Sequence, residues 1–223
     1  MEQILERANS WLSDFFDPEV RNEVKHLITH DEEELKDRFY RDLEFGTGGM
    51  RGVMGVGTNR INKYTLGKST QGLSNYLKKV YAGETLKVVI AYDCRHNSDT
   101  LSRLVAEVFS ANGIQVYLFS ALRTTPELSF AVRYLNCHAG VVLTASHNPP
   151  EYNGYKVYWT DGGQIVPPQD GEIIEEIKAI SFEDILFKPN EDLINLIDED
   201  VDEDFISSSE KNVSFVAEGK EDF

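Results

Sequence analysis

Residues 139–159 read AGVVLTASHNPPEYNGYKVYW, and this stretch decides which fold the chain can adopt. The run AGVVL is apolar at every position, as in a strand of a parallel sheet that is covered on both faces. Small polar residues follow it directly, and open α/β sheets place their ligands at the carboxyl ends of such strands. The stretch therefore predicts a buried strand over residues 139–145 that leads into a functional loop, with Ser146 as the first candidate for chemistry.

The same stretch predicts how the chain returns to the sheet. Residues 155–159, YKVYW, form a second predicted strand, and the connection between the two strands is too short for a helical crossover. We therefore expect an antiparallel neighbour. The pair Asn153-Gly154 is typical of a tight turn, and we expect it to bring Lys156 back beside the strand that precedes Ser146.

Helices and strands alternate on both sides of this stretch. Further strands are predicted over residues 86–92 and 114–120, and helices over residues 66–80, 99–112, 126–136 and 170–180. Gly113 stands at the left-handed cap position of the second helix, and Thr125 with Pro126 begins the third. This alternation indicates βαβ units. The predicted fold class is α/β, a three-layer α/β/α domain with a mixed, mostly parallel sheet.

An N-terminal helical extension is predicted over residues 1–40. Apolar residues recur there at helical spacing, first over residues 2–16 and then over residues 18–40, with Pro18 at a helix start. The α/β domain proper is then expected over residues 41–182. It begins with the glycine-rich segment EFGTGGMRGVMGVGTNR, which predicts a loop or an irregular strand.

Acidic residues dominate the segment that follows. Residues 183–204 contain ten acidic residues and one basic residue, without the glycine and the oxygen-ligand spacing of a calcium loop. A solvated linker or helix face is the simpler interpretation. We therefore expect residues 183–223 to be an acidic linker that continues toward whatever follows the domain.

Composition limits the class of protein and its partners. The chain is 41% hydrophobic, which is enough for a core, and its formal net charge of −16 disfavours nucleic acid and anionic membrane surfaces. The two cysteines, Cys94 and Cys137, form neither a disulfide framework nor a zinc cluster. The first residues, MEQILERANSWL, contain no long apolar stretch typical of a secretory leader, and no run of about 18 apolar residues occurs in the sequence, so we expect neither export nor a membrane span. We expect a soluble, cytoplasmic protein.

Ser146 and His147 are the first candidates for a site. The main-chain N–H groups of a tight turn after a strand can hold phosphate, and a serine hydroxyl can act as a nucleophile. The alternative is a serine that only caps the strand. His147 suits a substrate or phosphate contact better than a base for its own neighbour, and a hydrogen-bonded surface histidine is equally compatible with the pattern.

Lys156 and Arg51 are the candidate cations. Lys156 would supply positive charge or a proton to a phosphoryl group on Ser146, and otherwise it is solvated surface. Arg51 is the only base beside FGTGGM, where glycines permit close approach of the main chain to an anion. The glycine pattern does not match the dinucleotide-binding fingerprint G-x-G-x-x-G between a strand and a helix.

Three other groups favour structural interpretations. His26 and His30 have the spacing of metal ligands on a helix but lack a third ligand. In AYDCRHNSD, residues 91–99, an aspartate and an arginine are expected to organise a loop, and the cysteine between them is not expected to be a nucleophile. Trp11 and Trp159 are interpreted as packing residues.

Taken together, these segments resemble the α-D-phosphohexomutase superfamily. TASHNPPEYNGYKVYW resembles its phosphoserine signature, and FGTGGMRG, YDCRHNS and the helix start TTPELSFAV match other landmarks of its first domain in the same order. The spelling is most similar to the phosphoglucomutase/phosphopentomutase branch, in which a helical N-terminus is also usual. The resemblance covers residues 40–180 approximately.

The resemblance implies a mechanism and roles for four residues. Ser146 would carry a phosphoryl group, hand it to a sugar phosphate to give a bisphosphate intermediate, and recover a phosphoryl group from the other position. Through that phosphate, Ser146 would also be one ligand of Mg²⁺. Lys156 would be a general acid/base or phosphate-positioning group, Arg51 a phosphate contact and His147 a substrate contact. A sugar bisphosphate would act as the phosphorylating activator.

Members of that superfamily are much longer, with four domains. Their second domain brings the loop D-G-D-x-D-R for Mg²⁺ and their third the sugar-selecting loop G-E-x-S-G, and neither string occurs here. Residues 211–223, KNVSFVAEGKEDF, resemble the lead-in to the second domain. We therefore expect a first domain without domains II to IV, whether a shortened chain, a truncated gene product or a natural fragment.

Three functions remain open from the sequence. The first is the phosphoserine-bearing part of a phosphoglucomutase, phosphomannomutase or phosphopentomutase type of enzyme, an isomerase that is incomplete alone. The second is a non-catalytic domain that binds phosphosugars or another protein. The third is a serine hydrolase, which the absence of G-x-S-x-G disfavours.

Overall fold

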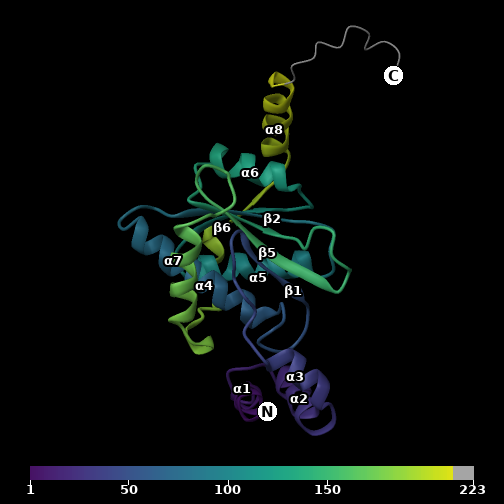
Figure 1. The fold of residues 1–223 in the computed structure, drawn as a ribbon. Coiled ribbons are helices and arrows are strands. Elements are labelled where there is room, and N and C mark those ends of the chain that lie inside the picture. The colour runs from purple at the N-terminus through teal and green to yellow at the C-terminus, as the bar shows by residue number, and fades with distance from the viewer. Residues whose placement is uncertain (213–223) are drawn as a thin grey trace, which may run out of the picture.

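The computed structural model describes residues 1–212, and its centre is a six-stranded sheet (Figure 1). The order of the strands is β1-β5-β4-β2-β3-β6. β4, β2, β3 and β6 run parallel to one another, whereas β5 and β1 are antiparallel to their neighbours. The strands are β1 (Gly49–Val53), β2 (Lys87–Tyr92), β3 (Gln115–Phe119), β4 (Ala139–Leu143), β5 (Tyr152–Tyr158) and β6 (Ile194–Ile197). The predicted mixed, mostly parallel sheet is confirmed.

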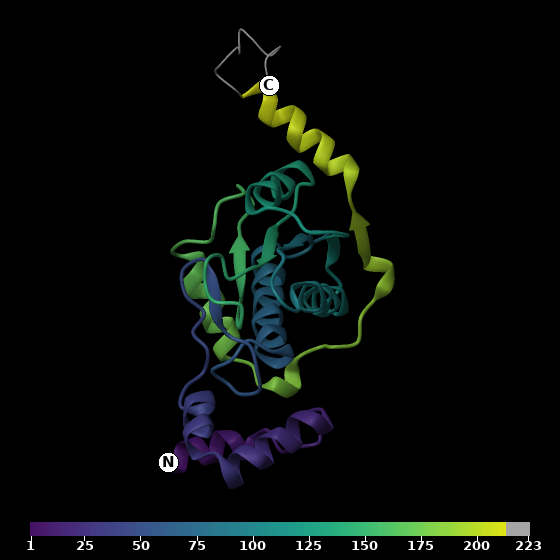
Figure 2. The ribbon, with the colours of Figure 1, turned by 90° about the vertical axis from the view of Figure 1, so that its right-hand side faces the viewer.

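Helices cover both faces of the sheet and complete the three layers (Figures 1 and 2). α4, α5 and α7 pack on one face, and α6 packs on the other with α8 beyond it. The bounds of these helices are α4 (Lys63–Val80), α5 (Ser98–Ala111), α6 (Thr125–Tyr134), α7 (Gln169–Lys178) and α8 (Glu199–Lys211). The helices predicted over residues 66–80, 99–112, 126–136 and 170–180 are therefore confirmed, with Thr124 rather than Thr125 at the cap of α6.

The central strand β4 is buried on both faces because helices cover it from both sides. All five of its residues are buried. Gly140 shows how close the packing is, since a Cβ added there would lie 2.5 Å from Cγ2 of Val132 in α6. A larger residue at this position would push α6 off the sheet. The apolar run AGVVL therefore forms the predicted buried strand.

The N-terminal extension forms three helices around a cluster of aromatic rings. They are α1 (Glu2–Ser10), α2 (Pro18–His30) and α3 (Glu32–Phe39). One helix over residues 18–40 was expected, but Asp31 ends α2 and caps α3, where its side chain accepts a hydrogen bond from the N–H of Glu34. Trp11 is fully buried and contacts Phe16, Phe39 and Tyr64, the last of which belongs to α4. The extension is therefore packed against the domain.

The acidic segment contributes structure that its composition did not predict. Ile194–Ile197 forms the edge strand β6 beside β3, and Val201 of α8 is buried against α6. Arg123, just before α6, makes ion pairs with Asp198 at 2.6 Å and Asp202 at 2.7 Å. The domain boundary at residue 182 stays a prediction, and the rest of the expected linker, residues 213–223, lies outside the described residues.

Glu127 of α6 lies in the same charge cluster as Arg123 and Asp202. Glu127 is 7% exposed, and its burial together with a hydrogen bond to Asp202 raises the pKa of its carboxyl to about 7. The Arg123 guanidinium holds the pKa of Asp202 below its usual range. Of the two carboxyls, Glu127 therefore holds a proton to higher pH than Asp202 does.

One turn prediction is wrong. Asn153 and Gly154 do not form a turn but lie within β5, where Gly154 pairs with Arg51 of β1. The chain reverses earlier, over residues 147–151. Lys156 nevertheless lies beside β4, in register with Val142, as the antiparallel arrangement requires. No helix within residues 1–212 is both long and apolar enough to cross a bilayer.

Candidate functional site

Ser146 lies in the loop that leaves the carboxyl end of β4, as the sequence predicted. The residue is exposed and its φ angle is 56°, in the left-handed region that residues other than glycine rarely adopt. Such a conformation costs about 1–3 kcal/mol and persists only where the surroundings impose it. One restraint is local, since the N–H of Ser146 donates to Oγ1 of Thr144 at 2.9 Å.

The loop itself is short and contains two consecutive prolines. The N–H of Asn148 donates to the carbonyl of Ala145 at 3.1 Å, and the N–H of Tyr152 donates to the carbonyl of Pro149 at 3.0 Å. Pro149 and Pro150 have no N–H to donate, so their peptide groups contribute only carbonyl oxygens. The loop therefore presents more acceptors than donors to its surroundings.

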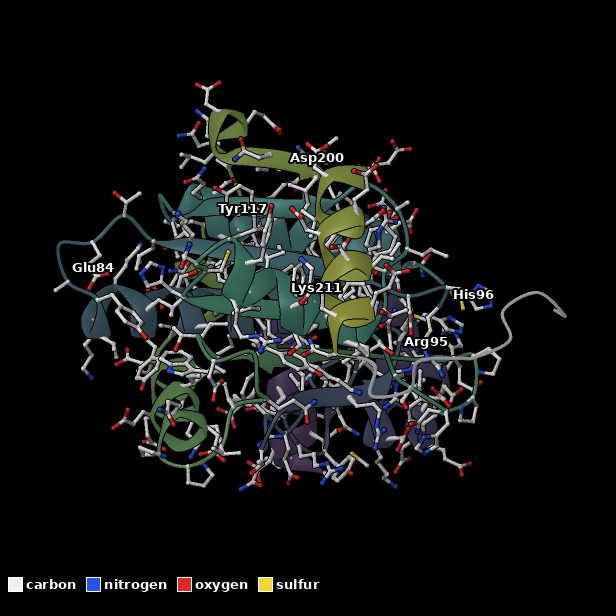
Figure 3. All side chains as sticks on the ribbon, turned by 90° about the horizontal axis from the view of Figure 1, so that it is seen from above. Glu84, Arg95, His96, Tyr117, Asp200 and Lys211 are labelled. Atoms are coloured by element: carbon white, nitrogen blue, oxygen red, sulfur yellow. The ribbon has the colours of Figure 1, made fainter. Side chains whose placement is uncertain are left out.

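Asp93 and Arg95, in the loop after β2, hold this turn. The guanidinium of Arg95 donates to the main-chain carbonyls of Ser146 at 2.5 Å and Asn148 at 2.7 Å. The carboxylate of Asp93 accepts a hydrogen bond from the hydroxyl of Thr144. Sequence reasoning expected an aspartate and an arginine to organise a loop, but it gave no indication that the loop is the one containing Ser146. Figure 3 shows Arg95 and His96 together at one side of the molecule, away from Glu84, which precedes β2.

Two hollows are lined by residues of this region. One has a volume of about 240 Å³ and is lined by Ser146, Asn148, Pro150 and the segment from Asp93 to His96. The other has a volume of about 370 Å³ and is lined by Thr144, Lys156, Arg51, Gln164 and residues 44–50 except Phe45. Thr144 lines the second hollow and binds the N–H of Ser146, so it connects the two.

Lys156 and Arg51 project from the same face of the sheet. Lys156 of β5 is in register with Val142 of β4, and Arg51 of β1 is in register with Gly154 of β5. Because side chains alternate along a strand, Val142, Lys156 and Arg51 share one face. The two predicted cations therefore meet in one hollow. Within residues 1–212 no hydrogen bond joins either of them to Ser146.

A glycine makes the close approach of these strands possible. A Cβ on Gly154 would lie 2.5 Å from the carbonyl oxygen of Thr144 and 2.9 Å from that of Met50. Any side chain at this position would push β5 away from its neighbours. Gly154 thus keeps the strand that carries Lys156 close to the residues before Ser146.

His147 points near Ser146 without a normal hydrogen bond to it. Its Nδ1 lies 3.4 Å from Oγ of Ser146, which is long for a hydrogen bond. Both residues are exposed, and Ser146 lines the smaller hollow. This arrangement suits contact with a bound molecule better than deprotonation of the serine.

The described residues do not form a complete site for Mg²⁺. Across residues 1–212, no group of three or more histidine, cysteine, aspartate or glutamate side chains is placed to hold a metal ion. His26 and His30 stack on each other at the surface of α2, with ring centroids 4.7 Å apart. The carboxylate that lines the smaller hollow together with Ser146 is Asp93, which already binds Thr144 and Arg95.

Comparisons with known proteins identify the family of this domain. The family model described as phosphoglucomutase/phosphomannomutase, alpha/beta/alpha domain I, matches residues 42–184. A protein named probable phosphoribomutase from Schizosaccharomyces pombe (strain 972 / ATCC 24843) is 44% identical over 173 residues, which is 76% of this chain and 30% of that protein. A phosphoglucomutase of Staphylococcus aureus (strain USA300) is 36% identical over 217 residues, covering 95% of this chain and 37% of the relative.

A solved structure shares the fold. The crystal structure of pp63/parafusin from Paramecium, titled a phosphoglucomutase in its open form, aligns with a TM-score of 0.60 at 18% identity, over 78% of this chain and 36% of that one. The chain spans only 26% to 37% of the length of the curated relatives it matches.

Proposed function

The chain belongs to the phosphoglucomutase/phosphomannomutase family through its first α/β/α domain, and on that premise we propose that it is the phosphoserine-bearing part of a phosphosugar mutase. The observation that carries the proposal is Ser146 itself. It is exposed and held in a left-handed conformation at the carboxyl end of a buried parallel strand. A serine that merely caps a strand needs no such restraint.

The proposed reaction moves a phosphoryl group between two positions of a sugar. A hydroxyl oxygen of the sugar phosphate attacks the phosphorus on Ser146, the bond from phosphorus to Oγ breaks, and the proton of the attacking hydroxyl is released to a base. The bisphosphate then reorients, and Oγ of Ser146 takes up the other phosphoryl group. Catalysis of this kind depends mainly on positioning and on neutralising the charge of the phosphoryl oxygens.

Lys156 and Arg51 are proposed to supply that positive charge. Thr144 lines their shared hollow and accepts a hydrogen bond from the N–H of Ser146, which lines the other hollow. Lys156 is half-buried, which favours a fixed contact over a solvated one, and we assign it the role of acid/base or phosphate-positioning group. Arg51 is exposed and suits a phosphate contact, while His147 suits a contact with the substrate.

Mg²⁺ and an activating sugar bisphosphate are part of the proposal because the resemblance implies them. When bound, the ion would neutralise charge on the phosphoryl oxygens. Ser146 is the one residue of this chain proposed to reach it, through its phosphate, so further ligands would have to come from elsewhere.

We also infer a cytoplasmic location, which fits the two free cysteines, and a sugar phosphate as substrate. Domains II to IV are the expected covalent partners.

The test is the intact mass of the purified chain, with and without glucose 1,6-bisphosphate and Mg²⁺. We expect wild type to gain the mass of one phosphoryl group and Ser146→Ala to gain none. Ser13→Ala is the matched control, because Ser13 is equally exposed but lies in the N-terminal extension. A gain retained in Ser146→Ala would refute the role of Ser146. Sugar-phosphate binding without any gain would favour a binding domain instead.

A further inference from the structure

Arg95 makes an unusual set of contacts with a single loop. Its Nη1 donates to the carbonyls of Pro149 at 2.9 Å and Tyr152 at 3.2 Å, and its Nη2 donates to the carbonyls of Ser146 at 2.5 Å and Asn148 at 2.7 Å. The arginine side chain is only 11% exposed. Four main-chain oxygens from seven residues of chain therefore converge on one cation.

Such an arrangement is unstable without a cation at its centre. Carbonyl oxygens carry partial negative charge and repel one another when they point at the same place, and water would have to solvate them if the cation were lost. A guanidinium offers five N–H groups in a rigid planar fork, whereas an ammonium offers three on a flexible stem. The shape of the loop thus depends on an arginine and not on positive charge alone.

Asp93 keeps Arg95 and the end of β4 in a fixed relation. Its Oδ1 accepts from the N–H of Arg95 at 3.1 Å, and its Oδ2 lies 3.9 Å from Nε of the same arginine. Oδ2 also accepts from the hydroxyl of Thr144, whose Oγ1 in turn accepts from the N–H of Ser146. Both peptide groups that flank Ser146 are therefore fixed, the N–H through Thr144 and the C=O through Arg95.

The direction of the carbonyl of Ser146 has a consequence for the next residue. In a trans peptide the N–H that follows points opposite to the C=O. The N–H of His147 therefore faces away from Arg95, and it has no acceptor in the part of the chain that the structure describes. A donor with this orientation, one residue from Ser146, is available to an anion on its hydroxyl.

We propose that Arg95 is a positioning residue, which fixes Ser146 and its loop in the conformation that accepts and donates the phosphoryl group. The inference rests on the proposed role of Ser146 in phosphoryl transfer. Arg95 touches no reacting atom, since its bonds go to main-chain oxygens on the loop. It acts by holding the left-handed conformation of Ser146 before any substrate binds.

The first test measures how fast the chain is phosphorylated by glucose 1,6-bisphosphate with Mg²⁺, in wild type, Arg95→Lys and Arg95→Ala. We expect the maximal rate to fall about 100-fold in both variants, with little change in the concentration that gives half the rate, because position and not affinity is lost. Guanidinium ion, added far below denaturing concentrations, should restore part of the rate of Arg95→Ala and none of the rate of Ser146→Ala. Arg103→Lys in α5 is the control and should match wild type.

Hydrogen exchange is the second test, and it does not depend on activity. In Arg95→Lys we expect faster exchange confined to peptides covering residues 144–153, with an unchanged thermal midpoint. Thr144→Val, which leaves the four bonds of Arg95 in place, should give a smaller increase. An Arg95→Lys chain that is phosphorylated within about twofold of wild type would overturn the inference.

The two proposals fail in different ways. If wild type takes up no phosphoryl group, the proposed activity of this chain fails, and exchange in the loop alone then decides the inference about Arg95. Unchanged exchange in Arg95→Lys overturns it, and faster exchange confined to residues 144–153 supports it. A global increase in exchange would show that Arg95 only stabilises the fold, which also overturns it.

Discussion

The N-terminal extension and the Ser146 loop are held in place by opposite means. The extension buries a cluster of aromatic rings around Trp11, in which polar contacts are secondary. Residues 146–151 belong to none of the three apolar clusters found in residues 1–212, and this loop is fixed by hydrogen bonds to Arg95 and Thr144. Apolar packing is non-directional and tolerates small shifts, whereas a fork of hydrogen bonds sets one geometry. This difference fits a supporting role for the N-terminal extension and a reactive role for the Ser146 loop.

The largest effect on either of these two regions is expected from Trp11→Ala. We expect the free energy of unfolding to fall by about 3–5 kcal/mol, because a large, fully buried ring is removed and a cavity is left. The measurement is chemical denaturation monitored by circular dichroism. Hydrogen exchange over residues 144–153 should stay unchanged under native conditions, since that loop shares no residue with the aromatic cluster.

A matched control for this prediction is Leu196→Ala. Leu196 is 66% exposed on the edge strand β6, so its loss should change the free energy of unfolding by no more than about 0.5 kcal/mol. If Trp11→Ala also loosened the Ser146 loop, the two regions would be coupled and the contrast between them would not hold.

Much of the fold was predictable because it follows from local patterns. The alternation of strands and helices, the buried strand β4 and the antiparallel return all came from periodicity and connection length. The turn predicted at Asn153-Gly154 was wrong because local preference is not the deciding factor there. The dipeptide favours a turn, but the pairing of β5 with β1 on one side and β4 on the other keeps it in a strand. Strand β6 was missed because four residues within an acidic segment carry too weak a pattern.

The candidate site was predictable only in part, for a related reason. The motif around Ser146 identified the loop, and the loop is where it was expected. The partner that holds it could not be predicted, because Arg95 lies 51 residues from Ser146 and 57 from Tyr152, and no local pattern encodes such contacts. Only the parallel pairing of β2 with β4 brings the two loops to the same edge of the sheet.

The contact between α6 and α8 contains both apolar packing and charged side chains. A change of pH should alter the contribution of the charged side chains and leave that of the apolar packing unchanged. The pKa of Glu127, raised to about 7 in the folded protein from 4.5, means that the folded state retains a proton that the unfolded chain releases. Its contribution to stability is therefore present below about pH 4.5 and is lost as pH rises to about 7. The lowered pKa of Asp202 acts in the opposite sense, and its contribution is lost only as the solution is acidified below the usual range of an aspartate.

Glu127→Gln tests this directly. Relative to wild type, the variant should gain roughly 2–3 kcal/mol of unfolding free energy between pH 5 and pH 8, because glutamine has no proton to lose. Denaturation curves at several pH values measure the difference. Glu175→Gln, at an exposed position in α7, should show no such trend. A constant offset between wild type and Glu127→Gln would mean that Glu127 is ionised throughout.

The smallest effect is expected where a charge pair joins the extension to α4. Nζ of Lys63 lies 2.8 Å from Oδ2 of Asp17, and the two side chains are 41% and 48% exposed. Water replaces the partner when an exposed pair is broken, so a double-mutant cycle with Lys63→Met and Asp17→Asn should give a coupling of at most about 1 kcal/mol. Arg95 also makes charged contacts, but its side chain is only 11% exposed and it serves four main-chain carbonyls. A coupling well above about 1 kcal/mol between Lys63 and Asp17 would show that solvent exposure does not explain why this pair differs from Arg95. The difference would then have to be explained by the number of hydrogen-bond acceptors that each cation serves.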